Sequence, residues 1–172
     1  FRRVLFRSLV LCKVEQGERV VVLAEPRSRQ DYVAASFAAA KRLGAQVMAL
    51  TLPGGPPSGT PVVRSGTGYG LQSLNENELA VEMLARADLV IDVTIEGFIH
   101  SPVLGRILGS QQFALEQGSG SSARVLYVCE PPEVLARNLP QEEDKAASLA
   151  GAQLLSEAKE MVVISEAGTD LH

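Results

Sequence analysis

The alternation of short β-branched runs with stretches of helical spacing constrains the fold of this chain most strongly. The runs are too short for helices and are separated by segments long enough for crossover helices, so successive strands are expected to pair in parallel. A parallel sheet needs helices on both of its faces. We therefore predict an α/β fold, a three-layer Rossmann-like or flavodoxin-like domain with a mostly parallel five-stranded sheet. The predicted strands lie within 18–26, 46–53, 88–95, 123–132 and 161–168.

Helical spacing of apolar residues predicts the helices between these strands. The helix before the third strand is expected to begin at Asn75 as N-cap, with Glu78 three residues later in a capping-box-like pattern. The last helix carries acidic residues in its first turn, which suits the helix dipole. The predicted helices lie within 28–45, 75–87, 101–118, 131–140 and 141–160.

The two ends of the chain are expected to differ from its body. Residues 1–8, FRRVLFRS, are basic and lack both the long apolar region and the cleavage site of a signal peptide. We expect them to be a non-native or disordered tail that packs against nothing. The chain stops directly after an apolar strand-like run, so we expect residues 9–172 to be the front part of a longer protein.

Composition excludes several classes of protein. The net charge is −4 and the Lys and Arg residues are scattered, which argues against a nucleic-acid partner. No apolar run reaches the roughly 18 residues of a membrane span, so no membrane partner is expected. Cys12 and Cys129 form no disulfide framework, and reduced thiols are typical of a cytoplasmic protein. No His/Cys cluster predicts a metal site in this chain.

Common phosphate and nucleophile motifs are absent or misplaced. The stretch SGTGYG at 65–70 is glycine-rich, but a dinucleotide fingerprint needs its glycines between the first strand and its helix. We favour a mobile loop there. No G-x-S-x-G elbow supports a hydrolase serine. Cys129 is interpreted as a core residue, because no base is visible near it in sequence.

Polar residues follow several predicted strands at their carboxyl ends, where open parallel sheets bind ligands. Glu25 and Glu130 each precede a proline. They are read either as solvated strand terminators, which the sequence favours, or as a polar pair at the ligand edge. The residues picked out at this edge are Glu25, the segment 95–100, Glu130 and Asp170.

His100 is the only histidine before the terminal His172, and it lies in the stretch IEGFIHSP at 95–102. Ser101 is the expected N-cap and Pro102 the first residue of the next helix. The positive end of a helix disfavours imidazolium, so a neutral ring there can accept a proton. Alternatively, the ring packs beside neighbouring apolar side chains. Position and chemistry leave both interpretations open.

Several stretches resemble the N-terminal half of the 2,5-dihydroxypyridine 5,6-dioxygenase family. They include HSPVLGRIL at 100–108, EPPEVLARNLP at 130–140 and SEAGTDLH at 165–172, of which EPPEVLARNLP and the HSP at 100–102 are the specific parts. The upstream stretches at 31–53 and 87–102 fit the same pattern, so the resemblance covers about residues 9–172. The wider fold family includes aminopeptidase T-like metallopeptidases, which share a two-part layout.

The resemblance implies that residues 9–172 are the N-terminal α/β domain of a longer two-part enzyme. That enzyme would be an extradiol-type non-haem Fe(II) dioxygenase, which opens 2,5-dihydroxypyridine with O₂ to N-formylmaleamate in nicotinate-type catabolism. Two histidines and one carboxylate hold the iron in such enzymes, and in the family they lie in the C-terminal half. The chain alone is therefore expected to hold no metal and to be inactive. A small aromatic N-heterocycle is the implied substrate, and the full-length protein is expected to be a homo-oligomer.

The resemblance also assigns roles to the residues around the HSP motif. His100 maps onto the family's acid–base histidine, on a loop over the active site, with Phe98, Ile99 and Ser101 as substrate-binding or lid residues. The pair Glu96-Gly97 stands where the family tends to be apolar. Gly97 is expected to loosen the loop, and Glu96 leaves the exact pyridine open. The segment 109–123 also looks longer than the family's turn.

Two other function classes stay open. One is the N-terminal domain of an aminopeptidase T-like metal-dependent aminopeptidase, and the other is a non-catalytic ligand-binding α/β module. Downstream metal ligands discriminate between them. Two His and one Asp indicate iron, a Glu/His/Asp set for two metals indicates a peptidase, and neither set indicates a binding module.

Overall fold

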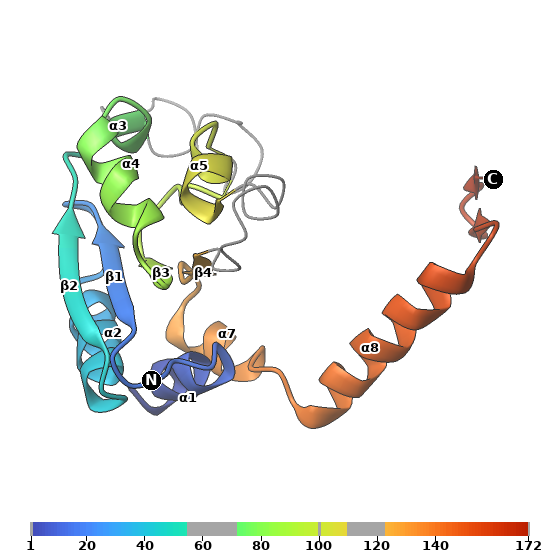
Figure 1. Cartoon of the computed structure of the whole chain (residues 1–172). Helices are drawn as coiled ribbons and strands as arrows, with labels where there is room; N and C mark the ends of the chain where they lie inside the picture. Colours follow the sequence, from blue (N-terminus) through green and yellow to red (C-terminus); the bar gives the residue numbers. More distant parts are fainter. Residues whose placement is uncertain (1, 55–71, 100, 110–122, 172) are drawn as a thin grey trace. The chain divides into compact units, whose positions relative to one another are not determined.

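The computed structural model describes residues 2–54, 72–99, 101–109 and 123–171 of the chain (Figure 1). It divides into two compact units, Phe1–Arg137 and Asn138–His172.

The first unit is built on a parallel sheet, as predicted. Its four strands have the order β2-β1-β3-β4, and every neighbouring pair is parallel. Leu23 of β1 is in register with Asp92 of β3, and Asp92 is in register with Tyr127 of β4. The carboxyl ends of these strands therefore share one edge of the sheet. The strands are β1 (Arg19–Ala24), β2 (Gln46–Thr51), β3 (Leu89–Asp92) and β4 (Arg124–Tyr127).

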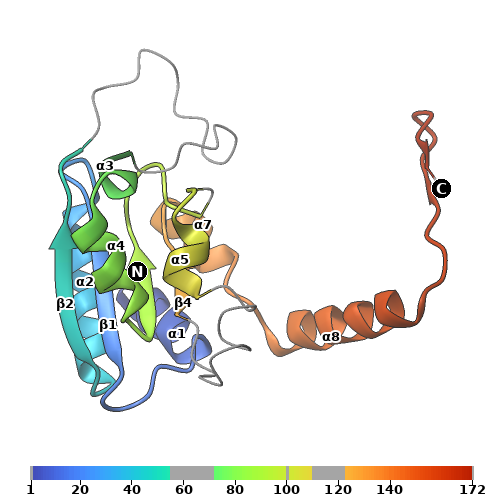
Figure 2. The same ribbon diagram turned by 45° about the horizontal axis from the view of Figure 1, so that its top comes forward.

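Helices cover both faces of this sheet, which confirms the three-layer α/β class. Alternate residues of β1 point to opposite faces: Val20 and Val22 pack in a core cluster with α1 and α2, whereas Val21 and Leu23 pack with α4 and α5. The views show α2 and α4 on opposite sides of the strands (Figures 1 and 2). The helices of this unit are α1 (Arg2–Leu11), α2 (Gln30–Arg42), α3 (Gln72–Asn75), α4 (Glu78–Ala85), α5 (Leu104–Leu108) and α7 (Pro132–Arg137).

Residues 2–11 differ from the expected disordered tail. They form α1, and Leu5 and Leu9 of this helix are fully buried in the core cluster of α2 and β1. The Arg42 guanidinium lies 4.7 Å from the centre of the Phe6 ring. Leu5 and Leu9 are four residues apart, which places them on one face of a helix. The basic composition of the segment hid this spacing.

The second unit contains one long helix and a short hairpin. Helix α8 (Glu142–Glu157) begins with a capping box, in which the Gln141 N–H donates to Asp144 Oδ2 at 2.7 Å. Strand β5 (Val163–Ile164) pairs antiparallel with β6 (Asp170–Leu171). The predicted fifth strand, 161–168, is thus not a member of the four-stranded sheet. A turn that begins at Ser165 and contains Gly168 at φ +97° ends the strand early.

Two predicted helix starts are also wrong by a few residues. Asn77, not Asn75, caps α4, and its side chain accepts a hydrogen bond from Ala80 N at 3.0 Å. Helix α5 begins at Leu104 rather than at Pro102, with Val103 at its N-cap. Residues 65–70 and 110–122 lie outside the described residues. None of the helices in the described part of the chain has the length and apolar character that crossing a bilayer requires.

Candidate functional site

The candidate site lies at the carboxyl edge of the four-stranded sheet. Strands β1, β3 and β4 end there at Ala24, Asp92 and Tyr127. The chain after β3 does not enter a helix at once but forms the stretch Thr94–Phe98, which precedes His100. Side chains from the ends of all three strands form hydrogen bonds to this stretch.

Asp92 is fully buried and accepts three hydrogen bonds. Its Oδ1 accepts from Thr94 N at 3.0 Å and from Thr94 Oγ1 at 2.6 Å, and its Oδ2 accepts from Phe98 N at 2.9 Å. Burial raises the pKa of Asp92 to about 6, and the charge of Glu25 adds to the rise, while the hydrogen bonds oppose it. An acidic residue at the end of an apolar strand thus organises the turn that follows it.

Glu25 approaches the same stretch from the end of β1. It is fully buried, and its Oε1 accepts from Ile95 N at 2.8 Å. Arg27 Nη2 lies 3.4 Å from Glu25 Oε2 and 3.9 Å from Glu96 Oε1. The Glu25 N–H donates to Ser28 Oγ at 2.8 Å. Glu25 is therefore a buried acceptor for a backbone group that is distant in sequence. The interpretation of Glu25 as a solvated strand terminator, which the sequence favoured, is wrong.

Tyr127 supplies the third anchor, from the end of β4. Its hydroxyl donates to the carbonyl oxygen of Ile95 at 2.7 Å. Its ring lies against Gly97, where an added Cβ would be 2.9 Å from ring atoms Cε2 and Cζ. Gly97 has φ +67°, and its N–H donates to Thr94 Oγ1 at 3.1 Å. Close approach and backbone conformation both demand glycine here, so the residue fits a tightly bound turn, in contrast to the expected loosening of the loop.

The predicted site residues around the HSP motif fall into different environments. His100 lies outside the described residues. Phe98 is fully buried in the core cluster of α4 and α5, whereas Ile99 is 45% exposed. Ser101 is buried; its hydroxyl donates to Asn75 Oδ1 and accepts from Val103 N at 3.2 Å. Of Phe98, Ile99 and Ser101, only Ile99 offers a substantial accessible surface.

The other residues predicted at the ligand edge are more dispersed. The backbone oxygen of Glu130 accepts a hydrogen bond from the Tyr32 hydroxyl at 2.6 Å. Cys129 is half-buried, with Sγ 3.8 Å from Glu130 Oε1. Asp170 lies in β6 of the second unit. Within the first unit, the structure thus brings together Glu25 and the segment after β3.

Sequence reasoning missed Asp92, Thr94 and Tyr127. A usable signal was present for Asp92, because a carboxylate inside an apolar run is rare unless it is paired. No comparable signal marked Tyr127, since its partner Ile95 is 32 residues away in the chain.

The described residues do not fit a two-histidine, one-carboxylate iron site. They contain no histidine, and they hold no group of three or more His, Cys, Asp or Glu side chains able to bind a metal. The carboxylates of Asp92 and Glu25 already accept backbone N–H groups. No metal chemistry is therefore assigned to these residues.

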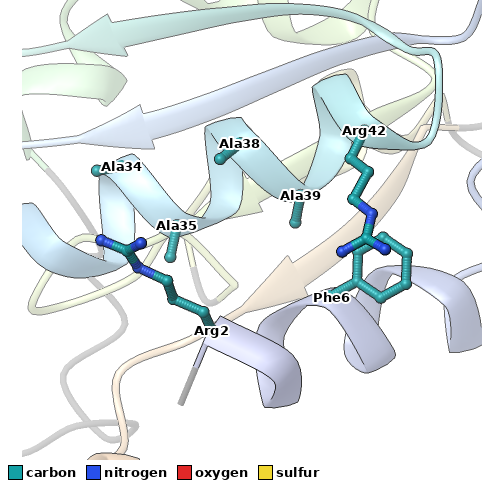
Figure 3. A pocket seen from close by; sticks show the side chains of 7 residues that line it. All are labelled: Arg2, Phe6, Ala34, Ala35, Ala38, Ala39 and Arg42. Carbon is teal, nitrogen blue, oxygen red and sulfur yellow. The ribbon is translucent and has the colours of Figure 1, made fainter.

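A hollow of about 280 Å³, separate from the site residues described above, is lined by side chains of α1 and α2. Figure 3 shows alanines of α2 along its wall, with Arg2 and Arg42 reaching in and the Arg42 guanidinium over the Phe6 ring. It contains no carboxylate, histidine or cysteine, so it offers no acid–base group. Its lining residues are Arg2, Phe6, Ala34, Ala35, Ala38, Ala39 and Arg42.

Comparisons with known proteins agree with one another. The family model of 2,5-dihydroxypyridine 5,6-dioxygenase (NicX) matches residues 1–172. A 2,5-dihydroxypyridine 5,6-dioxygenase of Pseudomonas putida KT2440 is 38% identical over 165 residues, which are 95% of this chain and 43% of that protein. A solved structure of 2,5-dihydroxypyridine dioxygenase from the same organism is 34% identical, with a TM-score of 0.76 over 98% of this chain and 45% of that chain. The chain thus spans less than half the length of these relatives.

Proposed function

The chain belongs to the 2,5-dihydroxypyridine 5,6-dioxygenase family, and we propose that it forms the N-terminal α/β part of a ring-opening dioxygenase. One observation carries this proposal: 38% identity over 95% of the chain to a protein of that name. The substrate we propose is 2,5-dihydroxypyridine. Both atoms of O₂ enter the opened product, N-formylmaleamate, so that one O₂ is consumed for each ring opened.

Fe(II) is the cofactor that we propose for the full-length, extradiol-type enzyme. A dioxygenase has to activate O₂, and Fe(II) held by two histidines and one carboxylate leaves coordination positions open for that purpose. The described residues of this chain do not supply such a set. We therefore expect the 172-residue chain alone to bind no Fe(II) at micromolar or tighter affinity and to be inactive.

His100 is proposed as the acid–base group that this chain contributes. Support comes from its place in the sequence, directly after a stretch that three strand ends bind. A neutral imidazole can take a proton from a ring hydroxyl of the substrate and return it later. Ile99, which is half-exposed, is proposed to contact the substrate, whereas the burial of Phe98 and Ser101 suits an anchoring role.

The test uses the full-length protein that carries this chain, loaded with iron under anaerobic conditions. O₂ and 2,5-dihydroxypyridine are then added, and O₂ uptake and loss of substrate absorbance are followed together. We expect one O₂ per substrate. Absence of substrate loss, together with hydrolysis of peptides by a two-metal form, would instead support the aminopeptidase T-like alternative.

The histidine is tested by His100→Ala in the same protein. General acid–base groups contribute about 10²–10⁴-fold, so kcat should fall by that factor. Iron content should stay at the wild-type level, because His100 is not proposed as a ligand. Lys41→Ala, an exposed change in the last turn of α2, is the matched control and should leave kcat unchanged. Loss of iron from His100→Ala, or normal turnover, would contradict the assignment.

The remaining properties of the full-length protein are proposals as well. We propose a homo-oligomer in the cytoplasm. Light scattering of the purified full-length protein measures the first property, and cell fractionation measures the second.

A further inference from the structure

Three side chains from three strand ends converge on one short stretch of backbone. Asp92 binds the N–H groups of Thr94 and Phe98, Glu25 binds the N–H of Ile95, and Tyr127 binds the carbonyl oxygen of Ile95. The proposed mechanism assigns no role to the two buried carboxylates among them. An acidic side chain is rarely buried without a specific partner, and here the partner is the backbone that leads into His100.

We propose that Asp92 and Glu25 are positioning residues: their carboxylates hold the backbone of residues 94–98 and, through it, set the placement of the acid–base group that follows. This inference rests on the proposed function. Neither carboxylate is proposed to touch the substrate.

The chemistry of Asp92 suits this role better than any neutral side chain would. An ionised carboxylate can only accept hydrogen bonds, and Asp92 is the acceptor in each of its three hydrogen bonds described above. Asparagine has the same shape, but its amide nitrogen would face the Phe98 N–H or the Thr94 donors. Asp92 and Thr94 are both fully buried, so water cannot replace the lost acceptor.

Glu25 differs in a way that makes a matched experiment possible. Only its Oε1 accepts the backbone N–H, from Ile95, 70 residues away in the chain. Its other oxygen lies 3.4 Å from Arg27 Nη2, whose side chain is 41% exposed. Glutamine keeps an oxygen acceptor for Ile95, whereas methionine has about the same length and no acceptor for it.

The effect on catalysis follows from geometry. A misplacement of about 1 Å in a catalytic group lowers the rate by as much as 10²-fold without contact between the mutated residue and the substrate. A positioning residue should therefore lower kcat through the group that it positions. Its effect should vanish once that group is absent, because there is then nothing left to position.

The activity test compares variants of the iron-loaded full-length enzyme. We expect Asp92→Asn and Glu25→Met to lower kcat by about 10–100-fold, with iron content unchanged, and Glu25→Gln to stay within about threefold of wild type. The double variant Asp92→Asn/His100→Ala should have the kcat of His100→Ala alone. Multiplying effects in the double variant, or near-normal kcat in Glu25→Met, would overturn the inference. If Asp92→Asn does not fold, the two Glu25 variants decide.

A second measurement separates this inference from the proposed function. Amide hydrogen exchange of the full-length protein should quicken by about tenfold or more at Phe98 in Asp92→Asn and at Ile95 in Glu25→Met, since each lost bond is worth about 1.4 kcal/mol or more there. Val21, inside β1, is the control and should not change. Failure of wild type to consume 2,5-dihydroxypyridine sinks the proposed function. Unchanged exchange at both amides sinks the positioning role, whatever the activity.

Discussion

The two edges of the four-stranded sheet are held together by groups that differ in burial. At the amino edge, Arg19 pairs with Asp88 at 2.8 Å and Arg124 pairs with Glu18 at 2.5 Å, with side chains between 22% and 58% exposed. Asp88 Oδ2 also accepts a hydrogen bond from the Arg19 backbone N–H at 2.7 Å. At the carboxyl edge, the fully buried Asp92 and Glu25 accept hydrogen bonds from backbone N–H groups.

Because of this difference, water can take over the interactions lost at the amino edge but not those lost at the carboxyl edge. Exposed ion pairs contribute little, because water and salt compete for the same groups. Buried carboxylates are expensive to desolvate, and removing one leaves donors that water cannot reach. The buried carboxylates of Asp92 and Glu25 lie at the carboxyl edge, where open parallel sheets generally bind ligands. We interpret it as a device for order in a functional loop rather than for overall stability.

The largest expected effect comes from Asp92→Ala. It leaves two backbone N–H groups and one hydroxyl without their acceptor in a fully buried site. The free energy of unfolding should fall by about 2–5 kcal/mol. Urea denaturation of the 172-residue chain measures it. Asp88→Ala at the amino edge is the matched control, and an equal loss there would abolish the contrast between the edges.

Gly97→Ala should have the next largest effect, about 2–4 kcal/mol, because it combines a left-handed backbone with overlap of the Tyr127 ring. Gly17 has φ +87° and open space around it, so Gly17→Ala isolates the backbone cost, about 1–2 kcal/mol. Gly105, inside α5 with nothing near it, should tolerate or gain from alanine. Thermal unfolding of the three variants checks this order, and equal losses at 17 and 97 would show that the Tyr127 ring yields.

The third largest effect expected is a pH dependence of the free energy of unfolding, caused by Asp92 at the carboxyl edge. The pKa of Asp92 is about 6 in the folded chain, above its ordinary value of 3.8. The folded chain therefore keeps a proton that the unfolded chain releases, and this contribution to stability is complete below pH 4 and lost as the pH rises through about 6. The slope is at most about 1.4 kcal/mol per pH unit for one proton.

The comparison that reveals this slope is wild type against Asp92→Asn, with urea unfolding measured at pH 4, 5, 6 and 7. Wild type should lose stability relative to the variant over that range. Glu25 faces Asp92, Arg27 and Glu96 lie next to Glu25, and all three side chains are present in both proteins. A constant difference between the two proteins across the range would show that Asp92 titrates as an ordinary carboxyl.

The smallest effect is expected at the amino edge, from Asp88→Asn. The hydrogen bond from the Arg19 guanidinium is the main reason that the pKa of Asp88 is lowered to about 2. Its contribution is therefore present above about pH 4 and lost as the pH falls toward 2, the opposite direction to Asp92. Because the pair is exposed, the change should be well below that of Asp92→Ala and should shrink in 0.5 M salt. Unfolding at pH 3 and 6 in low and high salt measures it.

Much of the first unit was predictable because the relevant signals are local. β-Branched runs and helical spacing depend on residues a few positions apart, and they were sufficient for the parallel α/β class and for strands β1 to β4. A local signal also marks α1: Leu5 and Leu9 have helical spacing, although the segment around them is basic. The strand predicted at 161–168 has a local β pattern, but the turn at Ser165 directs it to a hairpin.

The contacts of the candidate site could not be predicted in this way. Ile95 meets Glu25 across 70 residues and Tyr127 across 32, and both meetings depend on the register of β1, β3 and β4. The hydrogen bonds of the Asp92 carboxylate are to Thr94 and Phe98, which are close in sequence, yet its burial, the main cause of its raised pKa, arises only in the folded chain. Gly97 was read as a source of freedom because its conformational range is a property of the residue alone. Its close approach to the Tyr127 ring is a property of the folded chain, and folding turned the same residue into a point of tight packing.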